Sequence, residues 1–268
     1  MKFYVVSDVH GYYNQLKKAL KDAGYFDEKE PCKLIVCGDL LDRGKEAKQV
    51  VDFMLRQLEE NRLIYIRGNH EALFVRCLQE IAGGGVHEIA SGMSYHYTNG
   101  TWGSLLQLSN MSDVEAHSNS DELVRRVMKS SFYKKLLAEC VDYYETENYI
   151  FTHGWIPCHT QGYKPNVSYE FNSGWRNAGA TEWARARWYN GMELACMHHI
   201  TVPNKTVVCG HWHTSYGHSV IEKRGKEFDK NADFSPFEAK GILAIDGCTA
   251  YSGIVNCVVI EDETILDN

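Results

Sequence analysis

Short apolar segments that end in clusters of Asp, His and Asn constrain this chain more than any other feature of its sequence. β-branched and aromatic residues dominate residues 2–7, 33–38 and 62–68, which predicts three buried strands. A segment with apolar residues at helical spacing follows each strand, so strand, helix and strand recur at about thirty residues, the length of a βαβ unit. This alternation predicts a mostly parallel sheet flanked by helices.

A polar cluster begins where each of these strands ends. The three clusters read Asp8-Val9-His10-Gly11, Gly38-Asp39-Leu40-Leu41-Asp42-Arg43-Gly44 and Arg67-Gly68-Asn69-His70-Glu71. Two later strand-like segments, 149–154 and 206–211, deliver His153 and His211, and His213 lies just beyond. Because sites in open α/β sheets form beyond the carboxyl ends of the strands, we expect these side chains to meet at one sheet edge.

The side chains in these clusters suit a metal site. Asp oxygens and His nitrogens are ligands for borderline divalent metals such as Mn, Fe and Zn. The nine cysteines include no CxxC pair, which argues against a structural Cys-zinc site. Two divalent cations carry more positive charge than Asp8 and Asp39 can neutralise, so the site is expected to hold a phosphate dianion and to acidify a bound water.

Composition limits the class of protein. The chain has 268 residues, 44% of them apolar and 24% charged, which excludes a disordered chain. A net charge of −7 argues against a nucleic-acid-coating protein, and no apolar stretch is long enough to cross a membrane. The N-terminal apolar run is too short for a signal peptide, and most cysteines suit a reduced core. We therefore expect one cytoplasmic domain over 1–268, without nucleic-acid or membrane partners.

Periodicity predicts further elements along the chain. Helices are expected over 12–24, 45–60, 70–82 and 121–139, and strands over 241–246 and 256–261. The triple glycine at 83–85 and the polar composition of 86–120 predict a less regular middle. The segment 158–205 is expected to form loops and short helices. Within these regions, 83–98 and 158–180 are expected to form loops over a cleft and to select the substrate.

The motifs DxHG, GDxxDRG and RGNHE resemble those of the phosphoprotein phosphatase family of calcineurin-like metallophosphoesterases, most of all its bacteriophage-lambda and bacterial type. Looser parallels are NGTW (99–102), HGWIP (153–157), WARAR (183–187), GH (210–211) and IDGC (245–248). Ser7 departs from the pattern, since the family commonly has Gly before the first Asp. The resemblance implies an α/β, calcineurin-like fold in which central mixed β-sheets form a sandwich flanked by helices.

The resemblance also implies a set of metal ligands. One metal would be held by Asp8, His10 and Asp39. The second would be held by Asp39, Asn69, His153 and His211, so that Asp39 bridges the two ions. His213 fits the GHxH pattern of the wider superfamily and stays an open candidate. The two ions would be Mn as the first choice, with Fe or Zn as alternatives.

The resemblance assigns catalytic roles as well. A water or hydroxide between the metals would attack phosphorus in line. His70 would protonate the leaving group, and Asp42 would orient His70. Arginine forks would bind the phosphate oxygens, and the matching positions are Arg43, Arg67 and Arg185.

Three functions remain open from the sequence. The leading hypothesis is a phosphomonoesterase that acts on phosphoserine or phosphothreonine proteins or on a small phosphomonoester. The alternative is symmetrical hydrolysis of dinucleoside polyphosphates such as diadenosine tetraphosphate, for which Trp175, Trp183 and Trp188 are the candidates for a nucleoside pocket. A metal-binding scaffold without activity is disfavoured because no ligand position is lost.

Overall fold

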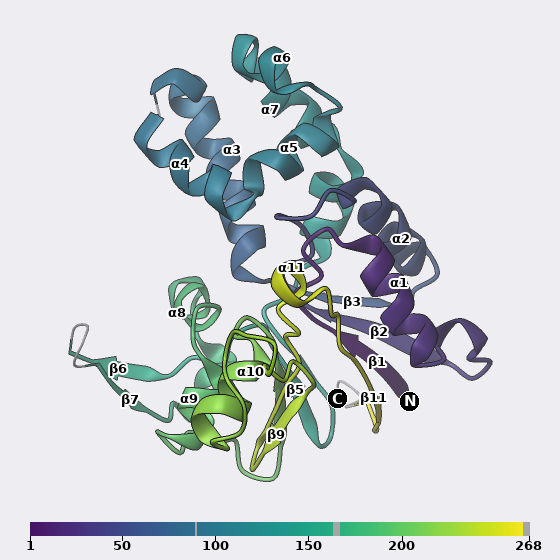
Figure 1. The fold of residues 1–268 in the computed structure, drawn as a ribbon, viewed down its shortest axis with the longest axis vertical. Helices are drawn as coiled ribbons and strands as arrows, with labels where there is room; N and C mark the ends of the chain where they lie inside the picture. The colour runs from purple at the N-terminus through teal and green to yellow at the C-terminus, as the bar shows by residue number, and fades with distance from the viewer. Residues whose placement is uncertain (89, 163–166, 265–268) are drawn as a thin grey trace.

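Two mixed β-sheets stack at the centre of the molecule (Figure 1). The structure is a computed structural model, and it describes residues 1–268 apart from 89, 163–166 and 265–268. The first sheet has the order β11-β1-β2-β3 and consists of β1 (Lys2–Val6), β2 (Cys32–Cys37), β3 (Leu63–Ile66) and β11 (Cys257–Glu261). The second has the order β4-β5-β8-β10-β9 and consists of β4 (Tyr144–Glu145), β5 (Tyr149–Phe151), β8 (Thr206–Cys209), β9 (Phe237–Ala239) and β10 (Ile242–Ala244).

Each sheet has a parallel centre and antiparallel edges. In the first sheet β1, β2 and β3 are parallel, and β11 runs antiparallel to β1. In the second sheet β5, β8 and β10 are parallel, with β4 and β9 antiparallel at the two edges. The expected mixed sheets are therefore confirmed, and the three strands predicted near the N-terminus form the parallel part of the first sheet.

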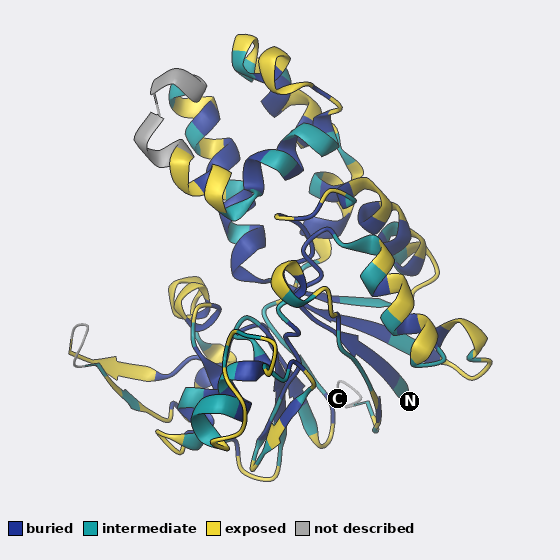
Figure 2. Cartoon of the chain, in the orientation of Figure 1, coloured by how far each residue is buried: buried dark blue, intermediate teal, exposed yellow. Residues whose placement is uncertain are grey.

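The alternation of side chains along the strands explains how the layers pack. Successive residues of a strand point to opposite faces, so Val5 and Val6 face different layers. Val5 and Ile35 of the first sheet share a buried cluster with Phe151 and Val208 of the second. Val6, on the opposite face, packs in the cluster that holds the buried faces of helices α1 (Tyr13–Asp22) and α2 (Ala47–Glu59). Figure 2 shows the central strands of the first sheet mostly in the dark blue of buried residues.

The outer face of the second sheet is covered by short helices. Ile150 and Val207 pack there with Trp155, Trp175 and Trp183. The helical segments are Trp175–Asn177, α8 (Ala180–Ala186), α9 (Gly191–Cys196), α10 (Thr214–Tyr216) and Gly217–Ile221. A further short helix, α11 (Thr249–Ser252), leads into β11.

A helical lobe lies over the edge of the first sheet (Figure 1). It consists of α3 (Asn69–Glu88), α4 (Ala90–Asn99), α5 (Thr101–Ser109), α6 (Asp113–Ser118) and α7 (Ser120–Lys129). The expectation of an irregular stretch over 83–120, with loops at 83–98, is wrong for the described residues. Ile81, Trp102 and Leu105 are buried in one cluster with residues of α7, and this packing outweighs the weak helix propensity of glycine.

Two other expectations need correction. The helix predicted over 121–139 ends at Lys129 and is followed by the short helical turns Phe132–Leu136 and Leu137–Glu139. Within 158–180, β6 (His159–Gln161) and β7 (Ser168–Glu170) pair as an antiparallel hairpin, and residues 163–166 lie outside the described residues. These strands have three residues each and are largely exposed, so they lack the buried alternation that reveals a strand in a sequence.

The described residues include no helix with the length and apolar character needed to span a bilayer. All nine cysteines are free thiols, and Cys37 and Cys209 are buried within strands. Burial raises the pKa of the Cys37 thiol well above its ordinary value, which keeps this group protonated and unreactive.

Candidate active site

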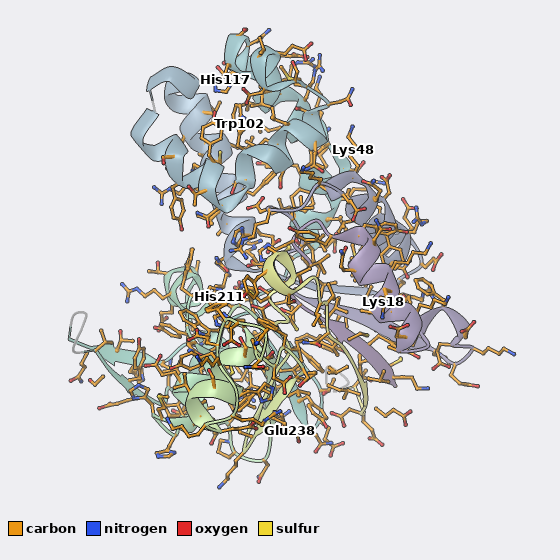
Figure 3. All side chains as sticks on the ribbon, viewed as in Figure 1. Lys18, Lys48, Trp102, His117, His211 and Glu238 are labelled. Carbon is orange, nitrogen blue, oxygen red and sulfur yellow. The ribbon has the colours of Figure 1, made fainter. Side chains whose placement is uncertain are left out.

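The ends of five strands bring the predicted ligands to one place. Asp8 and His10 follow β1, and Asp39 follows β2. The other side chains come from the ends of β3, β5 and β8 and are Asn69, His70, His153 and His211. In Figure 3 His211 lies between the helical lobe and the second sheet. The predicted side chains therefore lie close together, although their strands belong to two stacked sheets and not to a single sheet edge.

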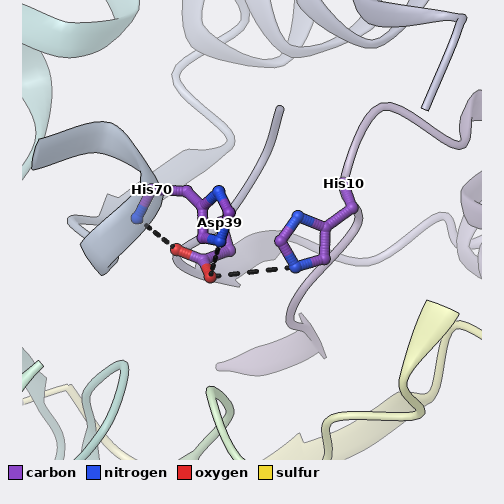
Figure 4. Close-up of side chains that lie close together, drawn as sticks. All are labelled: His10, Asp39 and His70. Carbon is purple, nitrogen blue, oxygen red and sulfur yellow. Dashed lines mark hydrogen bonds and ion pairs between the residues drawn. The ribbon is translucent and has the colours of Figure 1, made fainter. Parts of the chain in front are cut away.

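Asp39 belongs to two groups of potential metal-binding side chains. His10, Asp39 and His70 form one group, and Asp39, His153 and His211 form the other, with ligand atoms within 4.8 Å of one another in each group. The Oδ2 atom of Asp39 lies 3.8 Å from His10 Nε2 and 3.9 Å from His70 Nε2 (Figure 4). Its Oδ1 atom lies 3.3 Å from His153 Nε2. The two oxygens of one carboxylate thus face different groups, as a bridging ligand requires.

Several site residues have a left-handed backbone conformation. The φ angles are 49° at Asp8, 50° at His10, 53° at Asp39, 75° at Asp42 and 66° at His211. This region is uncommon for residues other than glycine, although Asp and His are enriched in it. Such conformations cluster at functional sites, where the surrounding structure holds them in place.

Backbone carbonyls fix the orientation of two imidazoles. His10 donates from Nδ1 to the carbonyl of Leu41 over 3.0 Å, and His153 donates from Nδ1 to the carbonyl of Cys37 over 2.7 Å. Both rings therefore turn Nε2 toward Asp39. A hydrogen bond from the remote ring nitrogen is the usual way in which proteins orient a metal-binding histidine.

Glu71 holds the loop that carries Asp39. Its carboxylate accepts hydrogen bonds from the backbone nitrogens of Asp39 at 3.0 Å, Leu40 at 2.9 Å and Gly68 at 2.7 Å. A Cβ atom on Gly68 would lie 2.1 Å from Asp39 Oδ1, so only glycine allows this close approach. Glu71 therefore acts on the backbone and does not enter either group of ligands.

Asp8 lies beside the first group. Its Oδ1 is 3.9 Å from His10 Nε2, and its Oδ2 accepts from the backbone nitrogen of His211 at 3.0 Å. The hydroxyl of Ser7 donates to the same carboxylate, so the residue that departs from the family pattern orients Asp8. Burial raises the pKa of Asp8 to about 6.

His70 and Asp42 form a buried pair near Asp39. His70 Nδ1 lies 2.7 Å from Asp42 Oδ2. Asp42 also accepts hydrogen bonds from the hydroxyls of Thr101 and Ser104, each over 2.8 Å. Burial lowers the pKa of His70, but Asp39 and Asp42 outweigh this effect and raise it above its ordinary value. The sequence analysis missed these two hydroxyls, although Thr101 lies in the NGTW motif and Ser104 follows one helical turn later.

The histidines of the two groups differ in their pKa values and therefore in their charge. Burial opposes charge on Asp39, yet His153 and His70 hold the pKa of Asp39 well below its ordinary value. Burial likewise opposes protonation of His153, but Asp39 raises the pKa of His153 to about 10. Burial lowers the pKa of His211 to about 3 and that of His10 well below its ordinary value. His10 and His211 are therefore neutral, which is the state that binds metals.

The candidate arginines lie in different places. The guanidinium of Arg43 lies 2.9 Å from His10 Nε2 and 3.2 Å from His70 Nε2, where it can contact a phosphate held at the site. Arg67 instead lines a cavity of about 410 Å³ with Glu71 and Arg187. Arg185 is exposed and lines another cavity with Trp188. The structure thus brings Arg43 to the ligand cluster and shows no contact of Arg67 or Arg185 with it among the described residues.

The last two candidates differ in their surroundings. Asn69 belongs to the cluster, since its Oδ1 lies 2.7 Å from His153 Nε2. His213 lies outside both groups, with its Nε2 2.7 Å from Glu227 Oε1 and its ring 4.5 Å from that of Phe228. The metal-binding and catalytic roles of all these residues stay predictions.

The comparison with known families agrees with this arrangement. The family model for calcineurin-like phosphoesterases matches residues 1–215. The chain belongs to this family. The fold expected for a calcineurin-like phosphoesterase is therefore confirmed, and the family consists of metal-dependent hydrolases of phosphoester bonds.

Two curated relatives with different names are similar to part of this chain. Bis(5'-nucleosyl)-tetraphosphatase PrpE [asymmetrical] of Anoxybacillus flavithermus is 33% identical over 76 residues, which cover 26% of this chain and 31% of that protein. Serine/threonine-protein phosphatase 2 of Escherichia coli is 33% identical over 94 residues, which cover 35% of this chain and 39% of that protein. The matched region thus spans about a third of each relative's length, 31% and 39%.

Solved structures resemble the chain over a longer range at low identity. The crystal structure of a putative diadenosine tetraphosphatase has a TM-score of 0.49 at 13% identity and covers 97% of this chain and 89% of that one. A protein serine/threonine phosphatase from Saccharomyces cerevisiae has a TM-score of 0.45 at 12% identity and covers 100% of this chain and 81% of that one.

Proposed function

We propose that this phosphoesterase is a two-metal phosphomonoesterase. Its main natural substrates are proteins that carry phosphoserine or phosphothreonine. The position of Asp39 carries the proposal. Its two carboxylate oxygens face separate groups of buried imidazoles, at 3.8 Å from His10 and 3.3 Å from His153. A single carboxylate shared in this way suits a pair of divalent cations.

The donor set fits such ions. Asp8, His10 and Asp39 would hold one, and the second would be held by Asp39, Asn69, His153 and His211. Carboxylate, amide and imidazole ligands suit Mn as the first choice and Fe or Zn as alternatives. When bound, the ions would offset the charge of the phosphate and lower the pKa of a water molecule.

The protein side chains supply the rest of the chemistry. Asp39 and Asp42 raise the pKa of His70, which favours its protonated form, and His70 would give this proton to the leaving oxygen. Arg43 lies between the rings of His10 and His70 and binds the non-bridging oxygens of the phosphate. A monoester dianion offers three such oxygens, whereas a diester has one of them esterified. The site therefore favours monoesters.

A second candidate function is hydrolysis of dinucleoside polyphosphates. Trp175 and Trp183 are buried in the core and cannot stack on a base, but Trp188 is 45% exposed beside His211. The PrpE relatives are named as bis(5'-nucleosyl)-tetraphosphatases, and one relative from Buchnera aphidicola is named as the symmetrical type. This chain matches each of these relatives over one short region, of 76 residues in the first and 71 residues in the second.

A substrate panel with Mn-loaded protein tests the proposal. The panel contains a phosphoserine peptide, a phosphotyrosine peptide, p-nitrophenyl phosphate, bis(p-nitrophenyl) phosphate and diadenosine tetraphosphate. We expect the monoesters to be hydrolysed with higher kcat/KM than the diester, and the phosphoserine peptide to exceed the phosphotyrosine peptide. A higher kcat/KM for the diester than for p-nitrophenyl phosphate would refute the monoester argument. Diadenosine tetraphosphate as best substrate would replace the protein-phosphatase assignment.

A further inference from the structure

A cavity of about 410 Å³ lies beside the start of α3. Its lining residues on this helix occupy positions 72, 75, 76 and 79, which share one helical face. The other walls come from the turns Phe132–Leu136 and Leu137–Glu139 and from the segments that follow β3 and α8. Val75, Tyr133 and Leu137 give the cavity an apolar wall, and its described lining contains none of the predicted metal ligands.

Three arginines line the cavity, and they differ in their partners. Arg187 pairs with Asp142, and Arg76 pairs with Glu80 over 2.6 Å. Arg67 forms no ion pair with any described residue, and its buried Nε atom has no hydrogen-bond partner among them. The cavity therefore holds one guanidinium without a paired carboxylate, and a cation beside an apolar wall favours an anion as ligand.

Arg67 and Arg187 lie near the same thiol, that of Cys140. Burial raises the pKa of this thiol, and the two guanidiniums oppose the effect only in part. The thiol therefore stays neutral and offsets neither charge. Arg187 is only 7% exposed, and its Nε atom is also buried with no hydrogen-bond partner in the described part of the chain. Two guanidiniums near one neutral group repel each other, and a bound anion would offset this repulsion.

Glu71 separates the cavity from the ligand cluster. It is the acidic residue of the described lining, but it is 1% exposed. Its carboxylate accepts from the backbone nitrogens of Asp39, Leu40 and Gly68, and it forms no ion pair with Arg67 in the described structure. The charge of Glu71 is thus directed to the loop that carries Asp39, and a ligand in the cavity lies outside the metal cluster.

We propose that this cavity binds a small carboxylate that carries an apolar body. The carboxylate group binds the guanidinium of Arg67 beside Arg187, and the apolar body packs against Val75, Tyr133 and Leu137. A planar carboxylate fits the fork of an arginine. A monoanion also matches the single unpaired guanidinium, whereas a phosphate dianion would leave buried charge without a partner. The volume of the cavity falls within the range of about 300–1,000 Å³ that is typical of small-molecule sites.

This site is additional to the phosphoesterase centre. The resemblance to the phosphatase family assigns Arg67 to the substrate phosphate, yet the side chain lines this cavity and contacts none of the predicted metal ligands among the described residues. A carboxylate in the cavity and a phosphate at the metals can therefore be bound at the same time.

Three probes test the chemistry of the ligand. Benzoate, benzamide and acetate are titrated by calorimetry into Mn-loaded protein saturated with inorganic phosphate, which occupies the metal cluster. We expect saturable binding of benzoate. Binding should be at least about tenfold weaker for benzamide, which lacks the charge, and for acetate, which lacks the ring. Absence of saturable benzoate binding, or equal affinity for benzamide, would overturn the proposal.

Omission of phosphate shows whether the two sites are separate. The Kd for benzoate should be the same with and without inorganic phosphate, because the cavity lies outside the metal cluster. If phosphate displaces benzoate, the carboxylate binds at the metals and the proposal is wrong.

Two variants locate the site. Arg67→Gln removes the unpaired charge and should weaken benzoate binding at least about tenfold. Val75→Phe fills the apolar wall, should weaken binding to a similar extent, and decides the question if Arg67→Gln does not fold. Arg125→Gln is the matched control, because this exposed arginine of α7 pairs with Glu122 outside the lining. Unchanged affinity in Val75→Phe, or equal weakening in the control, would exclude the cavity as the binding site.

Discussion

His70 and Asp42 lie 28 residues apart in the chain, yet their side chains meet over 2.7 Å between Nδ1 and Oδ2. Both side chains are almost fully buried, and the second oxygen of Asp42 accepts from Ser104. The pair therefore joins the loop after β2 to the first turn of α3 and to α5. It orients the other nitrogen of His70 toward Asp39, 3.9 Å away.

Replacement of His70 by Asn removes the proposed proton donor. We expect kcat for a phosphoserine peptide to fall by about 10²- to 10⁴-fold, the usual contribution of a positioned acid, while metal content is kept. The loss should be smaller for p-nitrophenyl phosphate, because its leaving group needs little protonation. Steady-state kinetics with both substrates measure the difference. An equal loss for the two leaving groups would show that His70 has another role.

Ser104→Ala tests how Asp42 is positioned. Without this hydroxyl the Asp42 carboxylate loses a partner, so it orients His70 less well and the activity with a phosphoserine peptide should fall about tenfold at pH 8. The alkaline limb of the pH profile should move to lower pH. Ser109→Ala is the matched control, since Ser109 is also buried on α5 and its hydroxyl donates to the carbonyl of Leu106, not to Asp42. A similar shift in both variants would assign the effect to helix stability.

The shared carboxylate predicts an asymmetry in metal binding. Asp39→Asn should weaken both metal sites, because each oxygen of Asp39 faces a different group. Asn69→Ala should weaken mainly the site near His153. His213→Ala is the control and should keep the full metal content, because His213 is bound to Glu227 outside both groups. Elemental analysis after Mn loading gives the number of ions, and loss of metal in His213→Ala would restore this residue as a ligand.

Gly210 and Gly83 should respond to alanine with opposite signs. A Cβ atom on Gly210 would lie 1.7 Å from Ser7 Oγ and 2.1 Å from Asp8 Oδ2. We expect Gly210→Ala to lower the free energy of unfolding by about 1–3 kcal/mol, as overpacking does. Gly83 lies inside α3 with open space around it, so Gly83→Ala should raise the free energy by about 0.5–1 kcal/mol. Urea unfolding of both variants measures the changes, and stabilisation by Gly210→Ala would contradict the packing at Asp8.

The stability of the metal-free protein should depend on the charge of His153. Burial opposes protonation, but Asp39 raises the pKa of His153 in the folded state to about 10, above the unfolded value of 6.5. The resulting stabilisation is complete below the unfolded pKa and is lost as the pH rises through the folded pKa. Urea unfolding at pH 7 and pH 10 should therefore show a larger decrease for wild type than for His153→Gln. Identical decreases would mean that His153 is neutral.

Much of the site could be predicted because its residues lie next to strands with a clear apolar pattern. The three N-terminal clusters and the two later histidines all meet as expected. Thr101 and Ser104 were missed because a hydroxyl on a helix has no distinctive sequence signal until its partner is known. The five helices of the lobe were missed in part because their apolar residues are sparse, and their burial depends on one another.

The sequence by itself determined the candidate chemistry of this protein, since the residue types and their positions after the strands select the proposed ligands and the proposed proton donor. Only the tertiary structure decided which side chains share a space. It placed one oxygen of Asp39 on each side of the cluster, bound His213 to Glu227, and left Trp188 exposed while burying Trp175 and Trp183. The physical reason is that strand periodicity is local, whereas these contacts depend on how two sheets and a helical lobe pack.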